Sequence, residues 1–247
     1  MNINYDRYVF TLKEIIISIA EWMGICAVVA YFFYKSIWAF VLLLLFLPLF
    51  FKWKKKRMIK KRKWELTLEF REAISMVSAN LQAGNSVENA FRRTYSDLKG
   101  LYKENADITK EFLGISRGLD SNLVLENLLS DLGNRSGVED ILDFADIFTV
   151  AKRTGGNLRE IITDTVDTIS EKIEMKRELR ILISEKQFEQ KIMCIIPFFI
   201  LAYIGFTSPG YFDSLYHNLS GIGIMSACLA AYAGALLWGM KITAVEV

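Results

Sequence analysis

The chain has 247 residues, of which 52% are hydrophobic and 23% are charged. The first value is high for a soluble protein and the second is high for a chain lying wholly in lipid, so the composition indicates a chain divided between membrane and water. The net charge of +2 is uninformative, because nine Lys and Arg residues within 52–63 mask a net charge of −7 over residues 64–190.

Two apolar runs come first. Ile15–Tyr34 has twenty residues, which as an α-helix extend about 30 Å, enough to cross a bilayer. Only two residues separate this run from Ile37–Phe51. Residues 1–51 are therefore predicted to form an N-terminal segment and a transmembrane hairpin, with spans at about 15–34 and 37–51. Pro48 in this second run and Pro197 in the later apolar run 192–207 are each expected to kink their helix.

Residues 52–63 form a basic juxtamembrane collar. Lys and Arg residues close to a span are retained on the cytoplasmic side, so the collar predicts that the N-terminus and the following segment are cytoplasmic. One broken span with the N-terminus outside is the alternative to the preferred hairpin. The collar is expected to bind anionic lipid headgroups rather than nucleic acid, because the membrane is adjacent. Its candidate headgroup contacts are Lys54, Lys55, Lys56, Arg57, Lys60 and Lys61.

Glu21 is the polar exception within the first apolar run. A carboxylate in the hydrocarbon is costly and usually faces other helices. It can pair with a polar group, be protonated, or lie near the interface if the helix is shifted. A proton pathway requires further such residues, and the spans offer few, so Glu21 is interpreted as a packing residue.

Residues 64–190 are predicted to be a cytoplasmic domain that is helical throughout. No proline lies between Met58 and Gln190, and apolar residues recur at helical spacing. Breaks at Gly and Asn residues divide the segment into six helices. No stop signal follows Leu158, so the sixth helix is expected to continue into the membrane. The predicted fold is all-α, an antiparallel six-helix bundle flanked by four transmembrane helices.

The helix ends inside this domain carry specific expectations. Ser86 is the predicted N-cap of the second helix. Asp107 is expected to cap a third helix that runs to about Leu119, and a short fourth helix is expected over Leu123–Leu132. Ser136 and Glu139 have the spacing of a capping box that opens the fifth.

Residues 191–247 are predicted to hold the second transmembrane pair, with spans at about 192–207 and 221–240 and a short cytoplasmic tail. Ser208–Ser220 contains no Lys or Arg, whereas Lys191 and Lys241 flank the pair. The connecting loop is therefore expected outside and the C-terminus inside.

The sequence offers no set of catalytic residues. Gly155-Gly156-Asn157 lacks the Gly-Lys-Ser/Thr ending of a phosphate-binding loop. The only histidine, His217, lies in the predicted outer loop, so no histidine base is expected in the cytoplasm. Cys26, Cys194 and Cys228 lie in apolar runs without the spacing of a metal or redox pair. The chain is predicted not to be an enzyme and to hold no cofactor or metal.

Two groups of residues are candidate contacts instead. The turns Gly84-Asn85-Ser86 and Gly155-Gly156-Asn157 are interpreted as tight helix corners, with a close contact surface or hinge for a partner as the alternative. The acidic group is interpreted as a solvated face, with a docking patch for a basic partner or a divalent-cation site without an ordered ligand loop as alternatives. The candidates are Gly84, Ser86, Gly155, Gly156 and Asn157 in the turns, and Glu139, Asp140, Asp143 and Asp146 in the acidic group.

In this order of elements the chain resembles the type II secretion system F family, particularly the tight-adherence (Flp pilus) platform proteins of the B kind. The resemblance covers nearly the whole chain and rests on several short motifs together. They are Leu81-Gln82-Ala83-Gly84-Asn85-Ser86 with Ala90, Lys152-Arg153-Thr154-Gly155-Gly156-Asn157-Leu158, Ser208-Pro209, Lys241-Ile242 and Val245-Glu246-Val247.

The resemblance implies a multi-pass inner-membrane platform of a pilus-assembly or secretion machine, which couples a cytoplasmic hexameric ATPase to the assembly of pilin subunits. Larger relatives carry two copies of the helical domain, so a single copy implies a second platform subunit or self-association. The alternative class is a membrane-bound signalling adaptor that recruits a cytoplasmic partner through its bundle. An adaptor with an external sensor requires a ligand-binding region outside, and the predicted outer segments are too short to enclose a pocket.

Overall fold

The structure is a computed structural model that describes residues 3–155, 157–208, 210 and 218–243. Helices account for 86% of the chain, and no strand occurs in this described part. The all-α prediction is therefore confirmed. The chain divides into two compact units, unit 1 (Met1–Val9 with Lys55–Met175) and unit 2 (Phe10–Lys54 with Lys176–Val247). Two long helices, α3 and α8, contribute to both units.

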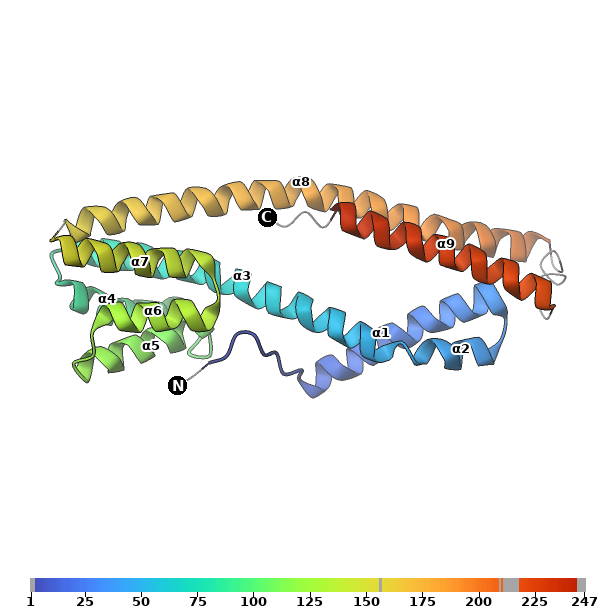
Figure 1. Cartoon of the computed structure of the whole chain (residues 1–247), viewed down its shortest axis with the longest axis horizontal. Helices are drawn as coiled ribbons and strands as arrows, with labels where there is room; N and C mark the ends of the chain where they lie inside the picture. Colours follow the sequence, from blue (N-terminus) through green and yellow to red (C-terminus); the bar gives the residue numbers. More distant parts are fainter. Residues whose placement is uncertain (1–2, 156, 209, 211–217, 244–247) are drawn as a thin grey trace. The chain divides into compact units, whose positions relative to one another are not determined.

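Unit 1 is a bundle of helices that packs around one core (Figure 1). The C-terminal part of α3 and the N-terminal part of α8 lie with four shorter helices. The bounds are α3 Leu47–Gln82, α4 Val87–Leu101, α5 Asp107–Asp120, α6 Leu125–Ser136, α7 Glu139–Thr154 and α8 Leu158–Thr207.

Aromatic rings from four of these helices form the centre of the core. The rings of Phe91 and Phe112 stack with centroids 5.9 Å apart, and Phe70 meets Phe144 edge to face at 5.5 Å. These residues are fully or almost fully buried, together with the aliphatic residues that the helical spacing predicted for α3. The aliphatic residues are Leu66, Ile74, Val77 and Leu81. Burial of such large apolar side chains is the main stabilising term for the bundle.

The predicted helix ends are only partly correct. Ser86 is the N-cap of α4, and its hydroxyl accepts a hydrogen bond from the Asn89 amide. The capping box at Ser136 is wrong, because α6 runs through Ser136 and ends at Gly137, whose φ of 58° is left-handed. Asp107 is the first residue of α5 rather than its cap. The fourth helix starts at Leu125, two residues later than predicted, because Asn122 also adopts a left-handed φ.

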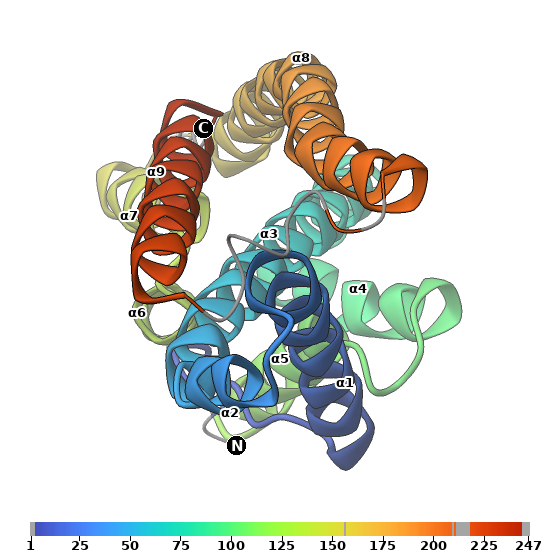
Figure 2. The same ribbon diagram turned by 90° about the vertical axis from the view of Figure 1, so that its right-hand side faces the viewer.

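Unit 2 consists of the apolar helices. It contains α1 (Leu12–Val29), a short π-helix η1 (Ala30–Tyr34), α2 (Ile37–Leu44) and α9 (Leu219–Thr243), with the remaining parts of α3 and α8. In Figure 2, α1 and α2 lie next to each other and are joined by the turn that Lys35 forms in a left-handed conformation. The hairpin predicted between the first two apolar runs is therefore present as a helix pair.

Three helical stretches are long and apolar enough to cross a membrane: Leu12–Tyr34, part of Leu158–Thr207, and Ser220–Ile242. The pair α2 and α3 makes a fourth if this pair counts as one broken span, because the two helices are bent by 48°. Pro48 explains the bend, since it has no N–H to donate to the Leu44 carbonyl and its ring clashes with that group in a straight helix. The kink predicted at Pro48 is therefore present, whereas Pro197 lies inside α8, which continues through it as one helix.

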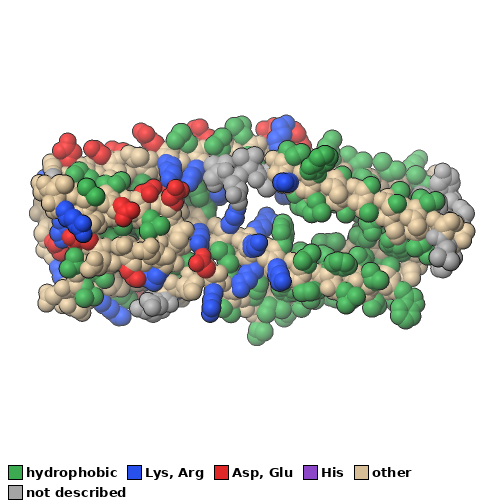
Figure 3. Space-filling view, in the orientation of Figure 1, with side chains coloured by type: hydrophobic (Ala, Val, Ile, Leu, Met, Phe, Trp, Pro, Cys, Tyr) green, Lys and Arg blue, Asp and Glu red, His purple; other side chains and the backbone are tan. Residues whose placement is uncertain are grey.

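Apolar side chains in unit 2 point outward as well as inward. A small cluster around Phe33 and Met225 joins the hairpin to α8 and α9, and the Tyr34 and Ser226 hydroxyls lie 2.9 Å apart. Most other large apolar side chains are exposed, and Figure 3 shows hydrophobic side chains over the surface of these helices. Such an exterior suits a hydrocarbon solvent rather than water.

Candidate functional site

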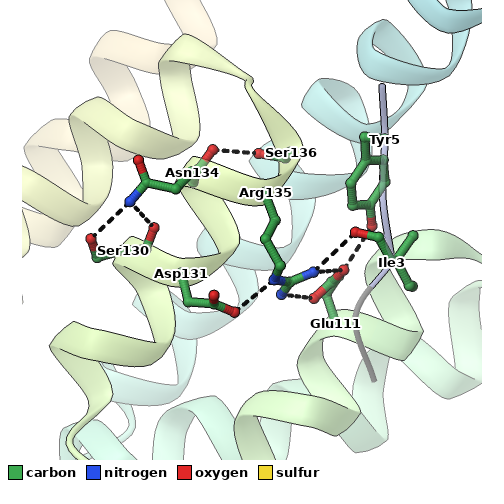
Figure 4. Close-up of polar contacts among 9 residues, drawn as sticks. Ile3, Tyr5, Glu111, Ser130, Asp131, Asn134, Arg135 and Ser136 are labelled. Carbon is green, nitrogen blue, oxygen red and sulfur yellow. Dashed lines mark hydrogen bonds and ion pairs between the residues drawn. The ribbon is translucent and has the colours of Figure 1, made fainter. Parts of the chain in front are cut away.

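The first residues that the structure describes form an unexpected part of unit 1. Residues 3–9, here called the N-terminal strap, lie without helix or strand against α3, α5 and α6 (Figure 4). Tyr5 is the anchor, because its side chain is 0% exposed within the core. Its hydroxyl donates a hydrogen bond of 2.9 Å to Glu111, and the Arg62 guanidinium lies 4.9 Å from its ring centroid.

The acceptor of this hydrogen bond belongs to a buried ion pair. Glu111 on α5 is only 5% exposed, and both its oxygens accept hydrogen bonds from the Arg135 guanidinium, at 3.0 and 2.7 Å. Arg135 also donates to Asp131 and to the Ile3 carbonyl of the strap. Burial and the Glu111 charge raise the pKa of Tyr5 well above its usual value, so the phenol stays protonated. This network ties the strap to α5 and α6.

A cleft of about 330 Å³ lies beside the strap within unit 1. One wall is a bidentate ion pair between Arg62 and Asp107, at 2.6 and 3.0 Å. Burial raises the pKa of Glu69, although a hydrogen bond from the Ile108 amide opposes the change. The cleft therefore mixes cations and carboxylates whose charges are largely satisfied by each other, an arrangement that serves structure more than ligand binding.

The acidic candidates on α7 do not act as one patch. Lys172 of α8 lies 2.6 Å from Asp140, and at 3.8 and 3.9 Å from Glu139 and Asp143. The Asp140 side chain is only 5% exposed, so this residue joins α7 to α8 rather than facing solvent. The hydrogen bond to Asp140 raises the pKa of Lys172, which keeps the ammonium charged. Glu139, Asp143 and Asp146 remain exposed.

The turn candidates occupy the corners that their sequence indicated. Gly84 has φ of 90° and Gly155 φ of 70°, values that favour glycine. A Cβ on either residue would meet no atom within 4 Å, so the backbone conformation, not close packing, explains the glycine. The Asn157 amide donates to Glu160 in the first turn of α8. Gly156 lies outside the described residues, as do His217, Pro209 and 245–247.

Glu21 has a partner in unit 2. Lys54 of the collar lies 2.5 Å from its carboxylate and also stands over the Phe50 ring. Of the three possibilities for Glu21, this contact favours pairing with a polar group. Lys54 is therefore paired within the protein and is less accessible to a lipid headgroup than the other collar candidates. The other candidates are exposed: Lys55, Lys56, Arg57, Lys60 and Lys61.

None of these arrangements resembles a catalytic centre. Within the described ranges, no group of three or more His, Cys, Asp or Glu side chains is placed to hold a metal ion. The charged residues with low exposure, such as Glu111 and Asp140, are instead paired with cations of neighbouring helices, which fixes helix positions.

Comparison with known proteins decides the family. The sequence model of the type II secretion system (T2SS) protein F matches residues 73–206, which is more than half of the chain. The chain belongs to the T2SS protein F family. No curated protein and no solved structure matches it. Proteins of this family are inner-membrane platforms of secretion and pilus systems rather than enzymes, and in general they work with secretion ATPases and other platform subunits.

The T2SS protein F match begins inside α3 and ends near the end of α8. It includes both glycine corners and the acidic candidates of α7. The N-terminal strap and the first hairpin lie before it. The strap was not predicted from the sequence, because the short segment 3–9, with tyrosines at positions 5 and 8, has no helical or strand periodicity. Chain termini are also usually ordered only where contacts hold them.

Proposed function

We propose that this chain is the inner-membrane platform of a Flp-type pilus-assembly or related secretion machine, and that it couples a cytoplasmic ATPase to pilin assembly. Its partners in this proposal are that ATPase, pilin-like subunits, and a second platform subunit or another copy of the chain. The tight-adherence motifs around Gly84 and Gly155 support the subtype. The signalling adaptor is not favoured, because the family match is to platform proteins.

One observation carries the coupling. α8 is a single helix of 50 residues that continues through Pro197 and contributes to both the bundle and the apolar unit. An uninterrupted helix of this length spans about 75 Å and transmits rotation or tilt with little loss. A movement imposed on unit 1 by a motor would therefore reach the membrane helices directly.

The proposed topology places both termini and unit 1 in the cytoplasm. The basic collar supports this side for unit 1. Tyr5 supports the same side for the N-terminus, because its side chain is buried within unit 1. A single broken span would place the N-terminus on the opposite side, so the strap favours a hairpin. The exposed collar residues remain candidates for anionic lipid headgroups.

The coupling proposal is tested by changing the stiffness of α8 without changing its surface otherwise. Lys176, Arg177 and Glu178 are replaced by three glycines in one variant and by three alanines in the matched control. Each glycine weakens a helix by about 1 kcal/mol relative to alanine. Pilus assembly or secretion should be lost in the glycine variant at unchanged membrane level and retained in the alanine variant. Equal activity in both would show that a continuous α8 is not the coupling element.

The topology has its own test. A single cysteine at position 130 (Ser130→Cys), in a chain whose three native cysteines are replaced, should resist an impermeant thiol reagent in intact cells. The same cysteine should react after the cells are opened. Labelling from outside intact cells would place the bundle on the wrong side and end the platform proposal.

A further inference from the structure

Helix α7 has two faces that carry apolar residues, and only one of them is used by the bundle. Its inner face buries Ile141, Phe144 and Phe148 in the core of unit 1. Its outer face exposes Ile147 by 43% and Val150 by 60%. These two residues are three apart on a helix and so are neighbours. Exposed apolar residues are common, and Leu123 and Val124 of unit 1 are exposed to a similar degree, so the pair on α7 points to a contact only together with the charges beside it.

Carboxylates flank this pair at helical spacing. Asp143 and Asp146 precede Ile147 and Val150 on the same outer face, so the four residues form a stripe about 10 Å long. Asp146 has no hydrogen bond or ion pair in the part of the chain that the structure describes. Asp143 has only a distant contact with Lys172, at 3.9 Å. We call these four residues the α7 stripe.

The neighbouring helix α8 carries a further row of carboxylates on its own exposed side. Its residues Ile162, Val166, Ile169 and Ile173 are buried, and four carboxylates recur on the opposite side at steps of three or four. Within the described residues none of these four takes part in a side-chain ion pair. They are Asp164, Asp167, Glu171 and Glu174. Figure 3 shows acidic side chains along the edge of unit 1 formed by α8.

The exposed carboxylates of this face of α7 (Glu139, Asp143 and Asp146) outnumber the cations beside them, Lys172 and Arg153, and this excess of negative charge restricts the occupant. Anionic lipid headgroups and nucleic acid carry the same sign and would be repelled. A second copy of unit 1 docking through the same face would bring carboxylates against carboxylates, which is unfavourable for a symmetric contact. A protein segment with Lys or Arg beside aliphatic residues complements both the charges and the apolar pair.

We propose that the α7 stripe is the docking site for a basic amphipathic helix of a cytoplasmic protein partner. Ile147 and Val150 supply the apolar contact, while Asp143 and Asp146 select Lys or Arg at the rim. Asp140 takes no part, because Lys172 already pairs with it. Taken together with the proposed function, the partner that carries this helix is the motor ATPase. The site is well placed for it, since α7 ends one tight corner before α8 begins.

The test uses the full chain in its own cells. A photoreactive benzophenone amino acid replaces Val150 in one strain and Leu101 in the control strain, because Leu101 is similarly exposed at 58% on α4. Irradiation should give a protein adduct at position 150 and little at position 101. Mass spectrometry of the adduct should identify a segment with Lys or Arg and aliphatic residues at helical spacing.

Charge reversal then tests the chemistry of the contact. Asp146→Lys should lower the adduct yield at position 150 by about tenfold, since it places like charges together. Glu104→Lys makes the same change at an exposed acid elsewhere in unit 1 and should leave the yield unchanged. No adduct above the Leu101 level, an adduct only with another copy of the chain, or a yield insensitive to Asp146→Lys would each overturn the docking site.

The identity of the partner separates this inference from the proposed function. An ATPase adduct supports both. A different protein with a basic amphipathic segment supports the docking site and counts against the ATPase as its occupant. The two proposals can also separate in the other direction. If the α8 glycine variant loses pilus assembly but no adduct forms at position 150, the platform function is supported and the α7 stripe is not a docking site.

Discussion

The two units use the same residue types in opposite ways. In unit 1 the phenylalanines at positions 70, 91, 112, 144 and 148 are buried against each other. In unit 2 Phe199 and Phe206 point outward, and few large apolar side chains are buried. A phenylalanine ring gains free energy on leaving water but gains almost nothing on leaving hydrocarbon. We infer from this difference that the surroundings of unit 1 are water and those of unit 2 are hydrocarbon.

Ion pairs show the same contrast. Glu111 and Arg135 in unit 1 form a bidentate pair with further partners, so that nearly every polar atom of the group is satisfied. Glu21 and Lys54 in unit 2 form a single contact, and about half of the Glu21 side chain remains exposed. The ion pair of unit 1 is thus satisfied by protein groups alone, whereas the Glu21 carboxylate of unit 2 still needs solvent or lipid headgroups around it.

The largest effect is expected from removing a ring from the unit 1 core. Phe144→Ala should destabilise unit 1 by about 3–5 kcal/mol, because it removes a buried ring and leaves a cavity against Phe70 and Phe148. The midpoint of thermal unfolding of the full chain in lipid nanodiscs, followed by protease cleavage within unit 1, is the measurement. Phe199→Ala is the matched change in unit 2 and should move this midpoint little. A similar fall in the unfolding midpoint for both variants would contradict the inference that unit 1 is surrounded by water and unit 2 by hydrocarbon.

A smaller effect is expected from the buried ion pair. Glu111→Gln keeps the shape of the side chain but removes the charge that holds Arg135 and Tyr5, at a cost of about 2 kcal/mol. The strap should detach more often, so trypsin should cut faster after Arg7. Cleavage rate in nanodiscs, compared with the exposed control Glu104→Gln, measures this release. An unchanged cleavage rate would mean that the Glu111 charge does not hold the strap, and that Tyr5 packing and the Asp6–Lys63 ion pair suffice.

The sequence predicted the apolar runs of unit 2 and the helical character of unit 1, because both leave a periodic or compositional signal. It did not predict that the second run breaks after Leu44 and that its remainder belongs to the long helix α3. The collar, the apolar runs and the uninterrupted sixth helix are visible in single segments of the chain. The family motifs around Gly84 and Gly155 indicated turns, and the structure places a left-handed glycine at each.

Contacts between distant segments could not be predicted in this way. Tyr5 lies 106 residues from Glu111, and neither residue is distinguished by its neighbours. The acidic residues of α7 looked equivalent in sequence, and only the position of Lys172 on α8 separates the buried Asp140 from the exposed Asp146. At Ser136 a local capping signal was outweighed by Gly137, because a left-handed glycine ends the preceding helix one residue later.

The smallest effect concerns the corner between α7 and α8. Gly155→Ala should cost about 1 kcal/mol, because an alanine at a φ of 70° strains the backbone even though the space around it is open. Gly114→Ala adds the same methyl group inside α5, also with no atom within 4 Å, and should stabilise unit 1 by about 0.5–1 kcal/mol. Unfolding midpoints of the two variants should therefore shift in opposite directions. A higher unfolding midpoint for Gly155→Ala would mean that the corner does not require a left-handed residue. The turns of unit 1 would then constrain the sequence less than its core does.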